Sequence, residues 1–179
     1  GKGKSSVGVL VVGGFITMVG LALTGVFAGD SSGLLFLAML SMAFFGCGVM
    51  TVPQSQMFVQ ESPKEYYGPV TSSRTCVGQL AYAIGLALGA AIASSVMTSL
   101  LVSDKGLSSA EATSETQKFL TGGATTVSGI KEFYTTGFTT AMFIFAGLVG
   151  VCIVLVLLLG RKASARSNAH ADTAAAAAA

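Results

Sequence analysis

Four long apolar stretches decide what this chain can fold into. They cover about 7–28, 33–59, 72–101 and 134–159. Each reaches or exceeds the roughly 20 residues that an α-helix needs to cross about 30 Å of hydrocarbon. Because backbone amides in lipid must be satisfied internally, each stretch is predicted to be a helix. The chain is therefore predicted to be an all-α integral membrane protein with four transmembrane helices in a lipid bilayer.

The composition agrees with a membrane environment. Of the 179 residues, 52% are hydrophobic and only 10% are charged, against about 25% charged in an ordinary soluble domain. The formal net charge of +2 is small, so no nucleic-acid partner is expected. Cys47, Cys76 and Cys152 are scattered through apolar runs, which favours buried free thiols over a metal site.

The basic residues predict the orientation. With an even number of crossings, both ends of the chain lie on one side of the membrane. That side collects Lys2, Lys4, Lys64, Arg161, Lys162 and Arg166. The opposite side carries the long segment 102–133, in which acidic residues balance the basic ones. The excess of basic residues predicts a multi-pass protein of the cell membrane with both ends in the cytoplasm.

The outer segment 102–133 and the C-terminal tail are polar or low in complexity. Ser108 followed by Glu111 is typical of a capping box, and the glycine pair 122–123 is typical of a helix stop. A short surface helix is therefore predicted near 109–120. The tail 167–179, which contains the only histidine and ends in a run of alanines, is expected to have no fixed structure.

Glycines punctuate the third apolar stretch. Gly85 and Gly89 form a GxxxG pair, and Gly78 precedes Gly85 by seven residues, so all three fall on roughly one helix face. Small residues let helix backbones approach closely in lipid, where little hydrophobic force drives association. These glycines are predicted to pack against another helix. The contact is either static or one that alternates during transport, and the pattern does not decide between them.

Polar residues at the predicted cytoplasmic ends of two helices are the candidates for a binding or gating site. Arg74 stands at the head of the third apolar stretch, and Gln79 lies one turn deeper. The arginine either snorkels to the headgroups or faces the helix bundle. In the second stretch Pro53 interrupts the backbone hydrogen bonds and is followed by Gln54 and Gln56. These residues either line a cavity or mark the membrane interface.

The acidic residues all lie outside the apolar stretches. They are Asp30, Glu61, Glu65, Asp104, Glu111, Glu115, Glu132 and Asp172. A proton-coupled transporter usually titrates a carboxylate within the membrane, so such a group would have to come from outside this chain. The sequence also contains no catalytic triad pattern, phosphate loop or metal-ligand spacing. No catalytic residue, metal or cofactor is expected, and an enzyme is not favoured.

The run PKEYYGPVTSSRTCVGQLAYAIGLALGAAIASSV, residues 63–96, resembles permeases of the major facilitator superfamily, and within them the fourteen-helix drug:proton antiporters. There, a short loop with Pro and Gly leads into a helix with an Arg, then Gly-Gln, then spaced glycines. Arg74, Gly78, Gln79, Gly85 and Gly89 match that pattern, and the resemblance spans residues 1–166.

The resemblance implies that residues 1–166 are the last four helices of such a transporter, within its C-terminal bundle. The N-terminal helices of the parent protein would then be partners of this chain and would supply the coupling carboxylates, with the proton as coupling ion. The transported compounds would be small and hydrophobic or cationic. The alternative is a self-contained four-helix membrane protein, either a small exporter subunit or a scaffold that transports nothing.

Overall fold

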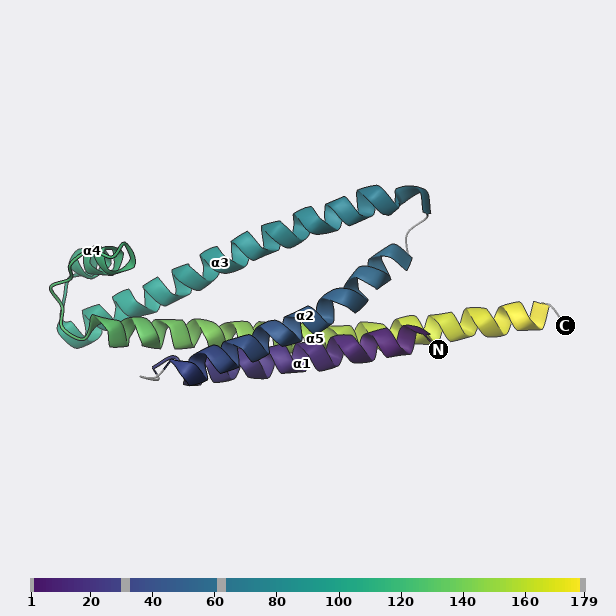
Figure 1. Ribbon diagram of the computed structural model, residues 1–179, viewed down its shortest axis with the longest axis horizontal. Coiled ribbons are helices and arrows are strands. Elements are labelled where there is room, and N and C mark those ends of the chain that lie inside the picture. The colour runs from purple at the N-terminus through teal and green to yellow at the C-terminus, as the bar shows by residue number, and fades with distance from the viewer. Residues whose placement is uncertain (1, 30–32, 61–63, 178–179) are drawn as a thin grey trace.

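The computed structural model describes residues 2–29, 33–60 and 64–177, and these ranges contain helices and connecting turns but no strand (Figure 1). The elements are α1 (Lys2–Val26), α2 (Leu34–Gln60), the 3-10 helix η1 (Lys64–Tyr66), α3 (Tyr67–Lys105), α4 (Ser109–Leu120) and α5 (Ile130–Ala177). In the described ranges α1, α2, α3 and α5 are long and apolar enough to cross a membrane. The prediction of an all-α chain with four potential membrane spans is confirmed.

The long helices alternate in direction. Figure 1 shows both ends of the chain near the end of the molecule where α2 finishes and α3 begins, whereas α4 lies at the opposite end. This arrangement is the one expected for four crossings. The side of the membrane on which the two ends lie stays a prediction.

Small residues bring α1 together with α2 and α5. A Cβ atom added at Gly20 of α1 would lie 2.6 Å from the backbone nitrogen of Ala43 in α2, so only glycine fits there. On the other side of α1, the Thr139 hydroxyl of α5 donates a hydrogen bond of 2.9 Å to the carbonyl oxygen of Gly25. Close backbone approach and hydroxyl-to-carbonyl bonds are the interactions expected to hold helices together in lipid.

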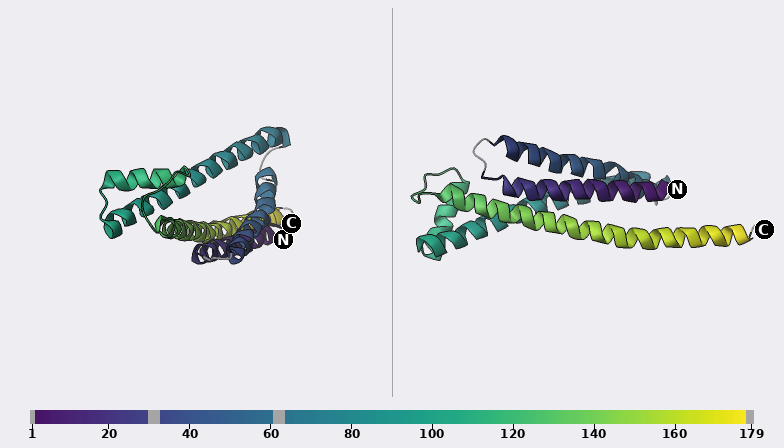
Figure 2. Two further views of the ribbon diagram at one scale, coloured as in Figure 1. Left: turned by 60° about the vertical axis from the view of Figure 1, so that its left-hand side comes forward. Right: turned by 90° about the horizontal axis from the view of Figure 1, so that it is seen from below.

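The two halves of α3 have different surroundings. Its second half packs against α5 and buries Ala93, Met97 and Leu101. Gly137 of α5 lies against Ala93 so closely that an added Cβ would overlap the Ala93 carbonyl oxygen. The first half diverges from α5 (Figures 1 and 2). At about 1.5 Å per residue, the 39 residues of α3 make it about 58 Å long, so it extends beyond the hydrocarbon.

The helix predicted near 109–120 is confirmed as α4. The Ser108 side chain accepts a hydrogen bond from the Glu111 amide, and the Glu111 carboxylate accepts one from the Ser108 amide, which completes the predicted capping box. The helix ends at Leu120, and Gly122 follows with a φ of +74°. That backbone conformation favours glycine.

Several features differ from the sequence-based expectation. Helices α1, α3 and α5 begin at Lys2, Tyr67 and Ile130, earlier than the expected 7, 72 and 134. The tail expected to be irregular is instead part of α5 as far as Ala177, which follows from the high helix propensity of alanine. The expectation of buried thiols is wrong, since Cys47, Cys76 and Cys152 are exposed. They lie on helix faces that no other described part of the chain covers.

Candidate ligand-binding groove

The start of α3 forms one side of a groove. The 3-10 turn η1 ends at Tyr66, and α3 follows with Pro69 in its first turn, where the missing amide hydrogen is not needed for a helical bond. Tyr66, Val70, Arg74 and Gly78 are spaced by four residues, so they fall along one face of the helix. This face carries the hydroxyl of Tyr66 and the guanidinium of Arg74 and ends at a glycine.

The groove lies between this face of α3 and the last turns of α2 and has a volume of about 930 Å³. Its polar lining consists of Gln54 from α2, Tyr66 from η1, and Ser73, Arg74, Thr75 and Gln79 from α3. The remaining lining residues are small or apolar. Three of the residues predicted as a binding or gating site, Gln54, Arg74 and Gln79, thus line one groove. The side chain of the fourth, Gln56, lies outside the described residues.

Arg74 carries the only formal charge among the residues that line the described groove. Its Nε atom is buried and has no hydrogen-bond partner among the residues that the structure describes. A guanidinium holds five N–H donors and stays protonated at physiological pH. The groove can therefore bind a group with hydrogen-bond acceptors, but it offers no nucleophile paired with a base.

The predicted packing residues lie in different environments. Pro53 is buried inside α2, which continues through it. A Cβ atom added at Gly89 would lie 3.1 Å from the Phe145 ring of α5, so this glycine is in contact with another helix. Gly78 lines the groove and Gly85 faces open space, and neither has a neighbour within 4 Å of an added Cβ. For these two, packing against a helix stays a prediction.

A second groove, between α3 and α4, was missed by the sequence reasoning. It has a volume of about 660 Å³ and is lined mainly by hydroxyl groups, including Ser95, Ser99 and Ser103 of α3. The hydroxyls of Thr98 and Thr116 lie 3.1 Å apart and link the two helices. The recurrence of serine every four residues along α3 is the signal that could have indicated this polar face.

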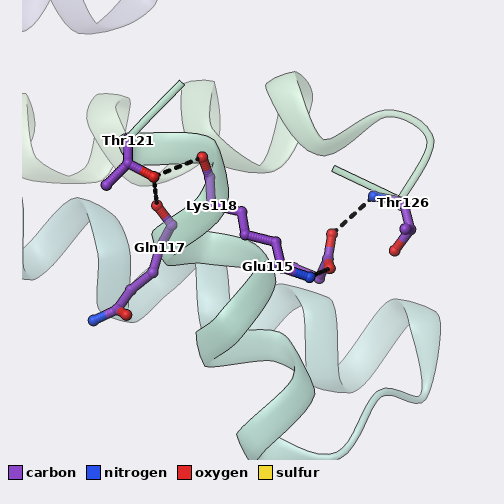
Figure 3. Close-up of polar contacts among 5 residues, drawn as sticks. All are labelled: Glu115, Gln117, Lys118, Thr121 and Thr126. Atoms are coloured by element: carbon purple, nitrogen blue, oxygen red, sulfur yellow. Dashed lines mark hydrogen bonds and ion pairs between the residues drawn. The ribbon is translucent and has the colours of Figure 1, made fainter. Parts of the chain in front are cut away.

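Glu115 of α4 is also a residue whose role was not predicted. It is buried, with 6% of its surface exposed. One carboxylate oxygen is 2.7 Å from Nζ of Lys118, and the other accepts a hydrogen bond of 2.9 Å from the backbone amide of Thr126 (Figure 3). The bond from Lys118, followed by that from Thr126, lowers the pKa of Glu115. The ionised carboxylate therefore links α4 to the segment before α5 through the bond from Thr126.

No cluster of three His, Cys, Asp or Glu side chains that could hold a metal ion occurs in the described part of the chain. Comparison with known proteins found no matching family model, no matching curated protein and no matching solved structure. The geometry of the chain itself therefore carries the functional argument.

Proposed function

We propose that this chain is part of a membrane transporter of the major facilitator type, which exports small hydrophobic or cationic compounds in exchange for protons. In this proposal the chain contributes to the C-terminal helix bundle, and the N-terminal helices of the parent protein supply the coupling carboxylates. The observation that carries the proposal is the groove in which Gln54, Arg74 and Gln79 meet from two otherwise apolar helices. Polar groups at such positions are expensive in lipid and usually mark a functional site.

The surface of the first half of α3 supports a larger assembly. Val77, Leu80 and Leu86 are all more than 60% exposed, and Gln79 beside them is exposed as well. An exposed apolar side chain is stable against lipid, but an amide side chain facing hydrocarbon is not. Further helices that cover this face would give Gln79 a polar or aqueous neighbour. Because Gln79 needs such a neighbour, the transporter is favoured over a self-contained four-helix protein.

Transport can be tested with the full-length parent protein in everted membrane vesicles. A proton gradient is generated, and the uptake of a fluorescent cationic dye is followed with and without a protonophore. We expect uptake that the protonophore abolishes, and an initial rate several times lower in the Gln79→Leu variant at equal expression. Lys105→Gln, a change at the far end of the same helix, is the matched control and should leave the rate unchanged. Uptake that does not depend on the proton gradient would contradict the proposal.

A further inference from the structure

Arg74 is a partly buried cation that lines the groove. Its Nε–H is shielded from solvent and bonded to nothing in the described residues, which is unfavourable for a hydrogen-bond donor. Glu115, the buried charge of α4, instead has both Lys118 and the Thr126 amide as partners. The Arg74 guanidinium can therefore bind an acceptor that enters the groove.

The residues around Arg74 favour an acceptor that is negatively charged. The other polar residues of the groove are neutral: Gln54, Tyr66, Ser73, Thr75 and Gln79. Each can donate a hydrogen bond through an amide or a hydroxyl. No carboxylate is among the described residues that line the groove. Among the described lining residues, a cationic compound would meet one positive charge and no negative one, whereas an anion would meet the positive charge and several donors.

The backbone of α3 adds to this preference. Tyr66, Pro69 and Val70, at the start of the helix, line the same groove. The aligned peptide dipoles of a helix place a partial positive charge at its N-terminus, which stabilises a nearby anion. The cap residue Tyr66 makes no side-chain cap hydrogen bond. Glu65, which immediately precedes the cap, is exposed and is not among the residues that line the groove.

The place of the groove in the fold indicates where the anion comes from. The groove lies where α2 ends and α3 begins, at the end of the molecule that also holds both chain ends (Figure 1). Arg74 immediately precedes the uncharged run of α3, so it lies at the depth where lipid headgroups meet the hydrocarbon. A volume of about 930 Å³ is within the ~300–1,000 Å³ of small-molecule sites and exceeds what a single inorganic phosphate needs. Basic pockets between transmembrane helices are known to hold anionic headgroups.

We propose that the groove around Arg74 binds a phosphate group, with the guanidinium as the charged anchor and the Gln54 and Gln79 amides as neutral donors. Planar guanidinium groups bind phosphate oxygens in pairs, which a lysine ammonium does not do. The phosphate belongs either to an anionic phospholipid headgroup or to a soluble phosphate compound. This proposal rests on the same groove as the proposed function and assigns the groove to a phosphate group, so the transported cations would bind elsewhere in the parent protein, and binding of phosphate does not require transport.

The test measures binding directly on the full-length membrane protein, purified in detergent. In one arm, mixed micelles containing phosphatidylglycerol are compared with micelles containing only phosphatidylcholine, and bound lipid is counted by native mass spectrometry. In the other arm, inorganic phosphate is titrated into the lipid-depleted protein and followed by calorimetry. Retention of phosphatidylglycerol over phosphatidylcholine identifies a lipid source, and binding of inorganic phosphate alone identifies a soluble source.

Variants distinguish binding in this groove from binding at other basic residues. We expect Arg74→Gln to weaken binding by about tenfold or more, equivalent to about 1.4 kcal/mol, and Arg74→Lys to weaken it less because the charge remains. Lys131→Gln, a cation on the distant outer end of α5, should bind like the wild type. Gln79→Ala, expected to weaken binding severalfold, carries the test if Arg74→Gln does not fold. The proposal is overturned if neither probe binds, if a folded Arg74→Gln binds as tightly as the wild type, or, where Arg74→Gln does not fold, if Gln79→Ala binds as tightly as the wild type.

Discussion

The two halves of α3 belong to one continuous helix but are stabilised differently. In the second half, Met97 and Leu101 are fully buried and form a cluster with Ala112 of α4 and Ile130 of α5. In the first half, Val77 and Leu86 are each 66% exposed. Both halves contain apolar residues together with polar ones, so the difference in exposure lies in their neighbours. The second half is held by contacts within this chain, and the first half depends on lipid or on helices from elsewhere.

The half of α3 that packs within the chain is also not the half that carries the candidate groove. The buried second half forms the close crossing with α5 at Ala93 and Gly137. The first half carries the groove with Arg74 and Gln79. A helix that is rigidly packed at one end and uncovered at the other can change its contacts at the uncovered end without loss of the fold. In the proposed transporter, that property would suit a site whose neighbours change during the transport cycle.

The largest effect on stability is expected from Met97→Ala. Met97 is fully buried, so its truncation leaves a cavity, and we expect a loss of about 2–5 kcal/mol in the free energy of unfolding. Leu86→Ala in the first half is the matched control and should change it by less than about 0.5 kcal/mol. Unfolding by sodium dodecyl sulfate in mixed micelles measures both. Equal losses at the two positions would show that the halves are not stabilised differently.

A smaller effect is expected at the helix crossing. In Gly137→Leu the new side chain would overlap the Ala93 backbone, and overpacking of this kind costs typically about 1–3 kcal/mol. Gly85→Leu places the same side chain where an added Cβ has no neighbour within 4 Å. In the 179-residue chain it should therefore change the free energy of unfolding by less than about 0.5 kcal/mol, measured by the same detergent titration.

Gly85→Leu also tests whether a helix from outside this chain packs on α3 in a longer protein. If helices outside this chain pack on Gly85, Gly85→Leu will destabilise the full-length protein and leave the 179-residue chain unaffected. A destabilised 179-residue chain would contradict the placement of Gly85 in open space. No effect in either protein would leave Gly85 facing lipid and remove its predicted packing role.

The local features of the fold could be predicted from the sequence. The four membrane-length helices follow from the lengths of the apolar runs, and α4 follows from Ser108 and Glu111, whose bonds span only three residues. The contacts between helices could not be read in the same way. Glycine spacing shows that a backbone can be approached, but not which helix approaches it. Gly20 and Gly137 are among the glycines in close contact with another helix, whereas Gly78 and Gly85 in the predicted motif have no such contact among the described residues.

Three residues that line the candidate groove were predicted as candidates, but its other polar residues and its geometry were not. Arg74, Gln54 and Gln79 stand out because polar residues are rare in apolar runs, and this reasoning needs only the sequence. The meeting of Gln54 of α2 with Arg74 and Gln79 of α3 in one groove is a tertiary property, which no local pattern specifies. Glu115 was missed for a similar reason. Its partner Thr126 is eleven residues away, across a turn whose path no local pattern specifies.

The smallest effect is expected at Glu115, through which α4, and with it the second half of α3, is tied to the segment before α5. The bonds from Lys118 and Thr126 hold the pKa of Glu115 below its ordinary value of 4.5. A carboxylate with a lowered pKa in the fold stabilises it above the ordinary value and loses that contribution as the pH falls through the lowered pKa. The protection of the Thr126 amide against hydrogen exchange should therefore be higher at pH 7 than at pH 3.

Two variants on α4 isolate this carboxylate. Glu115→Gln has no titrating group there, so Thr126 should lose most of the pH dependence of its protection and be less protected at pH 7. Glu111 also has a lowered pKa, caused by its bonds to Ser108, but it lies in the capping box at the start of α4. Glu111→Gln should therefore keep the dependence at Thr126. If Glu111→Gln abolishes it and Glu115→Gln does not, the end of the molecule that holds α4 is stabilised by the helix cap and not by the buried carboxylate.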